Sequence, residues 1–230
     1  MPIPAANAGQ DQEVYAWIDG IAEVTLDGSA SYDGDGDELT YLWTWSIDGN
    51  TYDTNGVDPT IELPVGVHTI ELVVNDGLED SEPNEVTITV VEPIEGTLLV
   101  VPRIINGQRG QRRIMAMLRL PAGISRQQID ASRKLLLYPG EIEANYQVIL
   151  RHFEHGGAER VVIFACFDKE SFVDAVGKLG PVQLDVVGQL KIGQYFYGTD
   201  TVRIINPPRW PPWRWWNWSH TINRYRPRAK

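Results

Sequence analysis

Three aspartates form the densest group of functional side chains in this sequence. Asp33, Asp35 and Asp37 are separated by Gly34 and Gly36, and glycine favours turns over strand or helix interiors. Carboxylates on a glycine-rich turn suit calcium, which accepts loose geometry and several oxygen ligands. The spacing is not that of an EF-hand, because no glutamate stands at the twelfth position. A solvated acidic turn explains the same residues without a metal, so the sequence leaves both interpretations open.

A second group of metal-ligand types lies in the segment RHFEHGGAER. His152, Glu154 and His155 are residue types that bind zinc. However, no third histidine or cysteine ligand follows at a recognisable spacing, and Gly156 with Gly157 already indicates a hairpin loop. We therefore interpret this segment as a turn between two strands.

No catalytic motif accompanies these groups. The sequence contains no G-x-S-x-G elbow, no P-loop and no dinucleotide-binding fingerprint. His68 lies in the strand-like run VHTIELVV, which favours a structural role. Cys166 is the one cysteine, which excludes an intrachain disulfide. It lies in VVIFACF, where we expect a small buried hydrophobic residue. The sequence therefore predicts a protein that is not an enzyme.

The most unusual composition is that of residues 207–230, PPRWPPWRWWNWSHTINRYRPRAK, which hold five of the eight tryptophans. Repeated prolines exclude a regular helix before Trp215 and favour an extended or polyproline-like segment. The candidate partner-binding residues are its first arginines and its indoles: Arg209, Trp210, Trp213, Arg214, Trp215, Trp216 and Trp218.

Three interpretations of this tail compete. Its composition resembles that of tryptophan- and arginine-rich peptides that bind anionic membranes; its indoles could stack on sugars; or it could pack on a protein surface. This many exposed indoles would promote aggregation, which favours docking against protein. Because prolines direct the tail away from the last predicted strand, we expect it to dock onto a neighbouring chain rather than its own.

Charge is distributed unevenly along the chain. Residues 1–94 hold 20 acidic and no basic residues, residues 95–206 hold 11 acidic and 14 basic residues, and residues 207–230 hold six basic and no acidic residues. A first region of net charge −20 would repel phosphates, so we do not expect it to bind nucleic acid. The chain thus has an acidic start and a basic end.

Apolar periodicity predicts seven short strands in the first region. In 39–46 the aromatic residues Tyr41, Trp43 and Trp45 alternate with smaller side chains, as in a strand that turns its aromatics into a core. We expect Trp43 to be buried between two sheets. The predicted strands are 13–18, 22–26, 39–46, a short piece near Thr51, 60–63, 67–75 and 85–91.

The region from 97 to 206 alternates in the same way and predicts a second β-sandwich. One helix is predicted after Asp168 as N-cap, with Phe172, Val176 and Leu179 on its apolar face and Gly180-Pro181 as its end. The residues between, 92–96, read as a short linker. The predicted strands are 98–104, 114–120, 134–137, 146–153, 161–167, 182–190, 194–197 and 201–205.

Residues 1–93 resemble a PKD domain. The resemblance rests on the opening PIPAANAGQDQ, the loop and strand GSASYDGDGDELTYLWTW, and the later stretches LPVGVHTIELVVNDG and EPNEVTITVVE. It implies an immunoglobulin-like β-sandwich in a protein that works outside the cell. In some PKD-like domains an asparagine near the start joins acidic residues of this loop around calcium. The resemblance thereby implies a ligand set of Asn7, Asp33, Asp35 and Asp37.

The sequence departs from the usual family pattern after the aromatic strand. Many members continue WDFGDG, where this chain has WTWSIDGNTYDTNG, and we expect a lengthened turn there. Further on, LRLPAGISRQQIDASRKLLL, FDKESFVDAV and FYGTDTVRII are similar to a module repeated in large bacterial and archaeal surface proteins. This second resemblance implies no activity.

Together these features predict an all-β chain. We expect two immunoglobulin-like sandwiches in tandem, at 1–93 and 97–206, with one short helix in the second and an extended tail at 207–230. No apolar run is long enough to span a membrane as a helix, and Met1–Gly9 lacks the features of a signal peptide. If the protein works outside the cell, we expect this chain to be a mature piece or a fragment.

The predicted function is structural or adhesive. We expect an extracellular or cell-surface spacer or assembly subunit, such as a filament component, that binds protein, either itself or its parent assembly, with calcium as an optional ligand. The alternative is a carbohydrate-binding module that uses the tail indoles or the exposed aromatics Tyr195 and Tyr197. Binding of nucleic acid is not expected.

Overall fold

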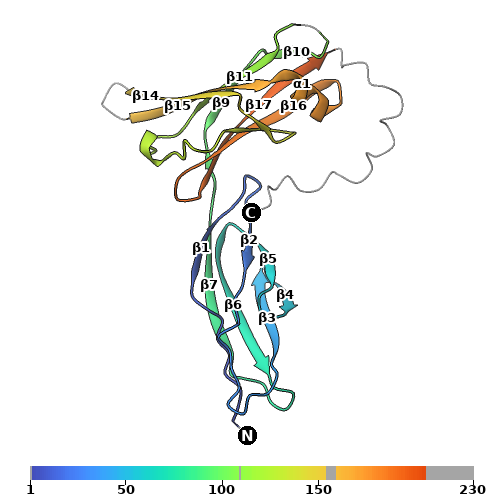
Figure 1. The fold of residues 1–230 in the computed structure, drawn as a ribbon, viewed down its shortest axis with the longest axis vertical. Coiled ribbons are helices and arrows are strands. Elements are labelled where there is room, and N and C mark those ends of the chain that lie inside the picture. Colours follow the sequence, from blue (N-terminus) through green and yellow to red (C-terminus); the bar gives the residue numbers. More distant parts are fainter. Residues whose placement is uncertain (1, 109, 154–158, 206–230) are drawn as a thin grey trace. The chain divides into compact units, whose positions relative to one another are not determined.

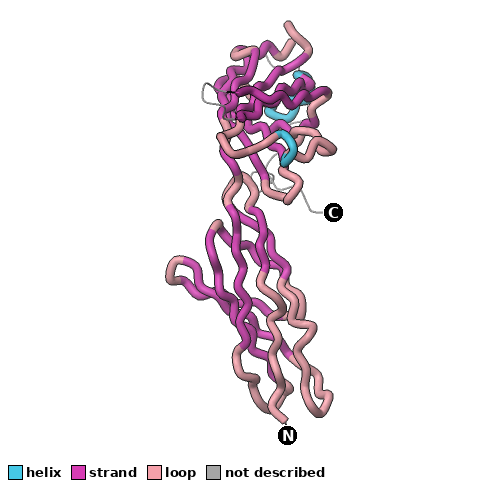
Figure 2. The backbone as a smooth tube through the Cα atoms, turned by 90° about the vertical axis from the view of Figure 1, so that its left-hand side faces the viewer, coloured by secondary structure: helices cyan, strands magenta, loops and turns pink. Residues whose placement is uncertain are grey.

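The computed structural model describes residues 2–108, 110–153 and 159–205. The chain divides into two compact units, Met1–Pro93 and Ile94–Lys230. Strands dominate both units, and the helical segments lie in the second (Figure 2). Within the described residues, no helix is both long and apolar enough to cross a membrane.

The described part of the first unit forms seven strands in two sheets (Figure 1). The larger sheet has the order β1-β7-β6-β3-β4, and β2 pairs with β5 in the smaller one. The first strand, β1, runs parallel to the last, β7, whereas the other pairs are antiparallel. The strands are β1 (Gln12–Tyr15), β2 (Ile21–Thr25), β3 (Thr40–Ile47), β4 (Asn50–Asn55), β5 (Thr60–Pro64), β6 (Gly66–Asn75) and β7 (Asn84–Val91).

Trp43 is the largest fully buried side chain of the first core, as predicted, with 0% exposure. Its Nε1 donates a hydrogen bond to the carbonyl oxygen of Gly56 at 2.9 Å, so the polar atom of the indole is satisfied. Gly28 makes room for this arrangement, because a Cβ there would lie 3.1 Å from the rings of both Trp43 and Tyr41. Tyr41 and Trp45 pack partly buried against the same core, which confirms the predicted face of β3.

The hairpin after the aromatic strand corrects one expectation. The extra residues do not lengthen the turn; they lengthen the strands β3 and β4, which are joined by Asp48 and Gly49 alone. Both turn residues have positive φ, 50° and 79°. An Asp-Gly pair adopts these angles readily, and a two-residue turn of this kind matches the twist of paired strands.

The second unit forms a sandwich of two sheets. One has the order β10-β17-β16-β12-β13, with β8 also paired to β17, and the other has the order β14-β15-β11-β9. Its strands are β8 (Ile94–Glu95), β9 (Thr97–Val101), β10 (Ile104–Asn106), β11 (Arg113–Arg119), β12 (Leu136–Tyr138), β13 (Ile142–Glu143), β14 (Tyr146–Phe153), β15 (Glu159–Asp168), β16 (Gly180–Gln189) and β17 (Tyr195–Ile205), and a short 3-10 turn spans Arg126–Gln128.

The helix of the second unit, α1 (Lys169–Val176), begins as predicted and ends early. The Asp168 side chain accepts a hydrogen bond from the backbone N–H of Ser171 at 2.7 Å and caps the N-terminus. Gly177 adopts the left-handed conformation and ends the helix. Leu179 therefore lies beyond the helix and is 56% exposed, so its predicted place on the apolar face is wrong.

Three further differences follow from local chemistry. The predicted strand 98–104 is split into β9 and β10 at Pro102, which has no N–H to donate to a ladder. Part of the predicted linker, β8, pairs with β17. Cys166 is half-buried rather than buried, because it points away from the core while its neighbours Ala165 and Phe167 point into it.

Candidate functional site

The acidic turn of the first unit is organised around one carboxylate. Asp33 Oδ1 accepts backbone hydrogen bonds from Asp35 at 2.7 Å, Gly36 at 2.9 Å and Asp37 at 3.2 Å. Partial burial alone would raise the pKa of Asp33, but the hydrogen bonds from these backbone N–H groups outweigh it and lower the pKa. The other oxygen, Oδ2, is buried and has no hydrogen-bond partner within the described part of the chain. Asp33 therefore holds the turn as an anion.

The backbone around Asn7 contacts the residues just before this loop. Ala5 and Tyr32 form an antiparallel bridge, and the Asn7 N–H donates to Ser31 Oγ at 3.0 Å. The side-chain oxygen of Asn7, however, accepts the N–H of Gly9 at 3.0 Å and closes a local turn. The structure thus brings the segment of Asn7 to the loop, with its side chain engaged elsewhere.

These groups do not form a calcium cage as they stand. Asp35 and Asp37 are exposed, and among the described residues no group of three or more histidine, cysteine, aspartate or glutamate side chains is placed to hold a metal ion. Asp33 Oδ1 and the side-chain oxygen of Asn7 already accept backbone N–H groups, whereas Asp33 Oδ2 has no partner among the described residues. The hydrogen bonds account for the turn without a cation.

A hollow on the first unit was missed by sequence reasoning. Its volume is about 340 Å³, and it opens on the β3, β4, β6 and β7 sheet with Trp45, Thr44 and Ser46 on its wall. Glu71 and Glu85 also line it, and they are direct cross-strand partners in the β6–β7 register. No local pattern reveals this pairing, because it depends on the register of strands far apart in sequence.

The side chains that face this hollow are polar. Thr44, Glu71 and Glu85 are cross-strand partners on the outer side of the sheet. Trp45 is paired with the buried Ile70 and turns its indole to the core side, where it stacks on Tyr52 of β4 with ring centroids 6.0 Å apart and planes inclined by 18°. Hydroxyl and carboxylate groups therefore border the concave surface, and they can exchange hydrogen bonds with the hydroxyl groups of a ligand.

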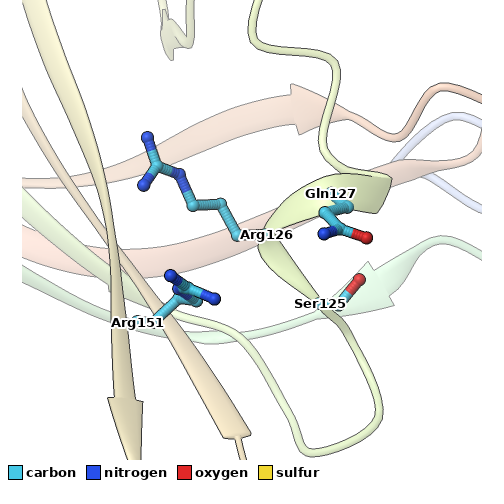
Figure 3. A pocket seen from close by; sticks show the side chains of 4 residues that line it. All are labelled: Ser125, Arg126, Gln127 and Arg151. Carbon is cyan, nitrogen blue, oxygen red and sulfur yellow. The ribbon is translucent and has the colours of Figure 1, made fainter.

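A second hollow, of about 360 Å³, lies on the second unit between the 3-10 turn and β14 (Figure 3). Ser125, Arg126, Gln127 and Arg151 line it. The Ser125 N–H donates to Gln128 Oε1 at 2.8 Å, which fixes the start of the turn. Both arginines are exposed to solvent, so any attraction for an anion is strongly screened.

The other predicted residues separate into two groups. Tyr195 and Tyr197 lie on one side of β17 and are half-buried, not exposed as expected, while Phe196 between them is fully buried. Of the suggested zinc ligands, Glu154 and His155 lie outside the described residues, and of His152 only the strand backbone is described. The candidate partner-binding residues of the tail, from Arg209 to Trp218, also lie outside the described residues.

Comparisons with known proteins give one family match and distant structural similarities. Residues 2–90 match the family model of the PKD domain, and no curated protein matches the chain. Among solved structures, a 1.5-MDa bacterial ice-binding adhesin is 18% identical with a TM-score of 0.30, over 89% of this chain and 66% of the other. The FN1–FN3 domains of chicken CNTN1 are 8% identical with a TM-score of 0.31, over 88% of this chain and 67% of theirs.

A third solved structure is a Bacteroides ovatus glucan-utilisation protein, SGBP-B, in complex with a mixed-linkage heptasaccharide. It is 15% identical with a TM-score of 0.25, and the match covers 86% of this chain and 43% of that one. The chain thus spans from less than half to about two thirds of the length of these three structures.

Proposed function

With residues 2–90 as a PKD domain, we propose that this chain is a non-enzymatic structural or adhesive module of an extracellular or cell-surface protein. It serves as a spacer or assembly subunit and acts through protein–protein contacts. The observation that carries the proposal is that the first unit combines a filled apolar interior with a surface whose charged residues are all acidic. Its interior is filled by an apolar core around Trp43, and its charge is entirely acidic.

The filled core and the acidic surface support a function in which the surface binds partners, rather than one that uses an internal site. A sandwich whose interior is packed with side chains leaves no enclosed volume for a substrate. A surface of one sign keeps such a module soluble and separates it from other acidic surfaces, while it steers basic partners toward it. Spacers and assembly subunits need both properties.

Location is the first test. Antibodies raised against the full chain should stain intact cells of the organism that encodes it, and staining should not increase after permeabilisation. Staining that requires permeabilisation would contradict a surface function.

Assembly is the second test: light scattering of the full chain over a concentration series should show association that weakens in high salt, because charged contacts are screened.

A second candidate function is carbohydrate binding, and the hollow lined by Glu71 and Glu85 favours it. Their carboxylates and the hydroxyl groups of Thr44 and Ser46 border one surface, and the half-buried Tyr195 and Tyr197 form a separate candidate. Glycan-array binding that is lost in Glu71→Gln with Glu85→Gln would support the hollow. Loss in Tyr195→Ala with Tyr197→Ala would support the tyrosines, and no binding by the full chain would exclude both.

A further inference from the structure

The outer side of the β14-β15-β11-β9 sheet is unusually apolar. Six large side chains point away from the core and are between 38% and 62% exposed: Leu99, Val101, Met115, Tyr146, Leu150 and Phe164. We call these six residues the apolar outer face. They alternate with core residues such as Val100 and Ala116, so this sheet is apolar on both sides. Strands of that kind are typical of sheets that are covered on both faces.

The apolar side chains are contiguous. In one cross-strand row Tyr146 lies opposite Cys166, Cys166 opposite Met115, and Met115 opposite Val101. The next row runs from Phe164 through Met117 to Leu99. Neither row contains a charged residue. Contiguous exposed apolar patches larger than about a few hundred Å² mark interaction surfaces.

The other sheet of the same unit provides a contrast. Its outer side carries Gln183, Asp185, Thr199 and Thr201, and Thr199 Oγ1 donates to Asp185 Oδ1 at 2.6 Å. Over these residues the side is polar, as expected of a sheet that faces water, although Ile104 and Ile205 at one end of β10 and β17 are also exposed. Two adjacent uncharged rows distinguish the apolar outer face from this side.

The chain leaves β17 close to one edge of that face. The backbone N–H of Arg203 donates to the carbonyl oxygen of Arg103 at 2.8 Å. Arg103 follows Val101 by two residues, which is at most about 7 Å of chain. The 25 residues of 206–230 come directly after the end of β17 and can extend over as much as about 80 Å. The tail thus starts within a few residues' length of the first row and can reach both rows.

We propose that residues 206–230 fold back on the apolar outer face of their own chain, with tail indoles covering its methionine, leucine and aromatic side chains. A tryptophan buries about 150 to 250 Å², so a few indoles suffice to cover the face. The thioethers of Met115 and Met117 make favourable contacts with aromatic rings. Covalent attachment raises the effective concentration of the tail to the millimolar range, which favours its own chain over the neighbouring chain expected from the sequence.

Cys166 is a built-in probe of this contact. It is the one cysteine of the chain, it is half-buried, and it lies in the first row between Tyr146 and Met115. The rate of its alkylation by iodoacetamide is measured in the full chain and in a full-length variant with all five tail tryptophans replaced by serine. We expect alkylation to be several-fold slower in the unmutated chain, and acrylamide quenching of tail fluorescence to be reduced, already at a dilution at which light scattering shows a monomer.

Face variants provide the matched control. Met115→Gln with Phe164→Gln, which removes apolar surface without adding charge, should raise the alkylation rate to that of the serine variant. Thr201→Gln, on the polar outer side of the other sheet, should leave it unchanged. Far-ultraviolet circular dichroism confirms that each variant is folded before it is compared.

Several outcomes would overturn the proposal. Equal alkylation rates with and without the tail indoles would show that the tail does not cover the face. If Cys166 is protected from alkylation only at concentrations at which the molecular mass doubles, the tail of a neighbouring chain covers the face. If Cys166 stays protected in a dimer of the serine variant, the same face of a second copy covers it. Protection lost on adding anionic vesicles, with a blue shift of the tail indoles, would make the tail a membrane ligand. The proposed surface function does not depend on any of these results.

Discussion

Trp43 is the residue on which the first core most depends. Its side chain has no exposed surface, and its one polar atom is paired with Gly56. We expect Trp43→Ala to lower the free energy of unfolding by about 3 to 5 kcal/mol, the range for emptying an aromatic site in a core. Urea denaturation followed by circular dichroism measures the loss. Leu42→Ala is the control: Leu42 is the next residue on the same strand but is 43% exposed, and its loss should cost under about 1 kcal/mol.

Asp168 makes a pH-dependent contribution to the second unit. Hydrogen bonds from the backbone N–H and the hydroxyl of Ser171 lower its pKa. Because the folded-state pKa lies below the unfolded value of about 3.9, the stabilisation is fully present above that value and is lost as the pH falls through the folded pKa. Asp168→Ala should cost about 0.5 to 2 kcal/mol near neutral pH.

The control for Asp168 is Asp168→Asn, which keeps a capping oxygen and removes the titrating group. Free energies of unfolding are measured from pH 7 to about pH 3. The destabilisation by Asp168→Ala should shrink as the carboxylate of the unmutated protein is protonated, and the unmutated protein should approach Asp168→Asn. A gap between Asp168→Ala and the unmutated protein that stays constant over this range would contradict the assignment.

Asp33 separates the two interpretations of the acidic turn. Because its Oδ1 already accepts three backbone N–H groups, we expect Asp33→Ala to lower the melting temperature equally in calcium and in chelator. Differential scanning fluorimetry in both buffers tests this. A ligand of the folded state stabilises by mass action. A calcium-dependent rise in the unmutated protein that disappears in Asp33→Asn would therefore establish a calcium site.

At the scale of elements, β6 and β7 contain an unfavourable pair. Glu71 and Glu85 lie directly opposite each other in a unit without a lysine or arginine, and like charges in that position are destabilising. Glu85→Lys should therefore raise the free energy of unfolding by roughly 0.2 to 1 kcal/mol. Chemical denaturation at low salt measures the gain, which should fall as salt is added. Glu82→Lys, an exposed loop position outside this register, controls for the change in net charge.

The elements also show how far sequence reasoning reached. Alternation of apolar residues predicted the strands and the buried face of β3, because a period of two is imposed locally by the extended backbone. The N-cap of α1 was likewise readable from Asp168 and the residues after it. The end of α1 was not, because Gly177 competed with Gly180 and Pro181 as a stop signal, and the earlier glycine adopted the left-handed conformation.

The candidate sites were less predictable than the strands. The carboxylates of the acidic turn were recognised from the sequence. That Asp33 Oδ1 accepts hydrogen bonds from backbone N–H groups of the same turn could not be predicted from it. The sequence did not reveal that Cys166 and the apolar outer face point to solvent, because a strand with apolar residues on both sides has the pattern of a wholly buried strand. The hollow beside Trp45 depends on register across β3, β6 and β7, which no local pattern encodes.

At the scale of the whole molecule, both units share one feature of connectivity. In the first unit β1 runs parallel to β7. In the second unit β8 runs parallel to β17 at Phe196 and Tyr197, and β10 runs parallel to its last residues. In each unit, therefore, the strand where the chain enters is hydrogen-bonded in parallel to the strand where it leaves.

This connectivity decides how the units respond to tension. When the two ends of a unit are pulled apart, parallel terminal strands must slide past each other, so their hydrogen bonds are loaded together, whereas an antiparallel hairpin opens one bond at a time. Single-molecule pulling should give a higher rupture force through the ends of the first unit than through handles at Leu42 and Asn55, the open end of the β3–β4 hairpin. Equal forces would contradict this. If the chain serves as the proposed spacer, we expect such units to carry load along the chain without opening.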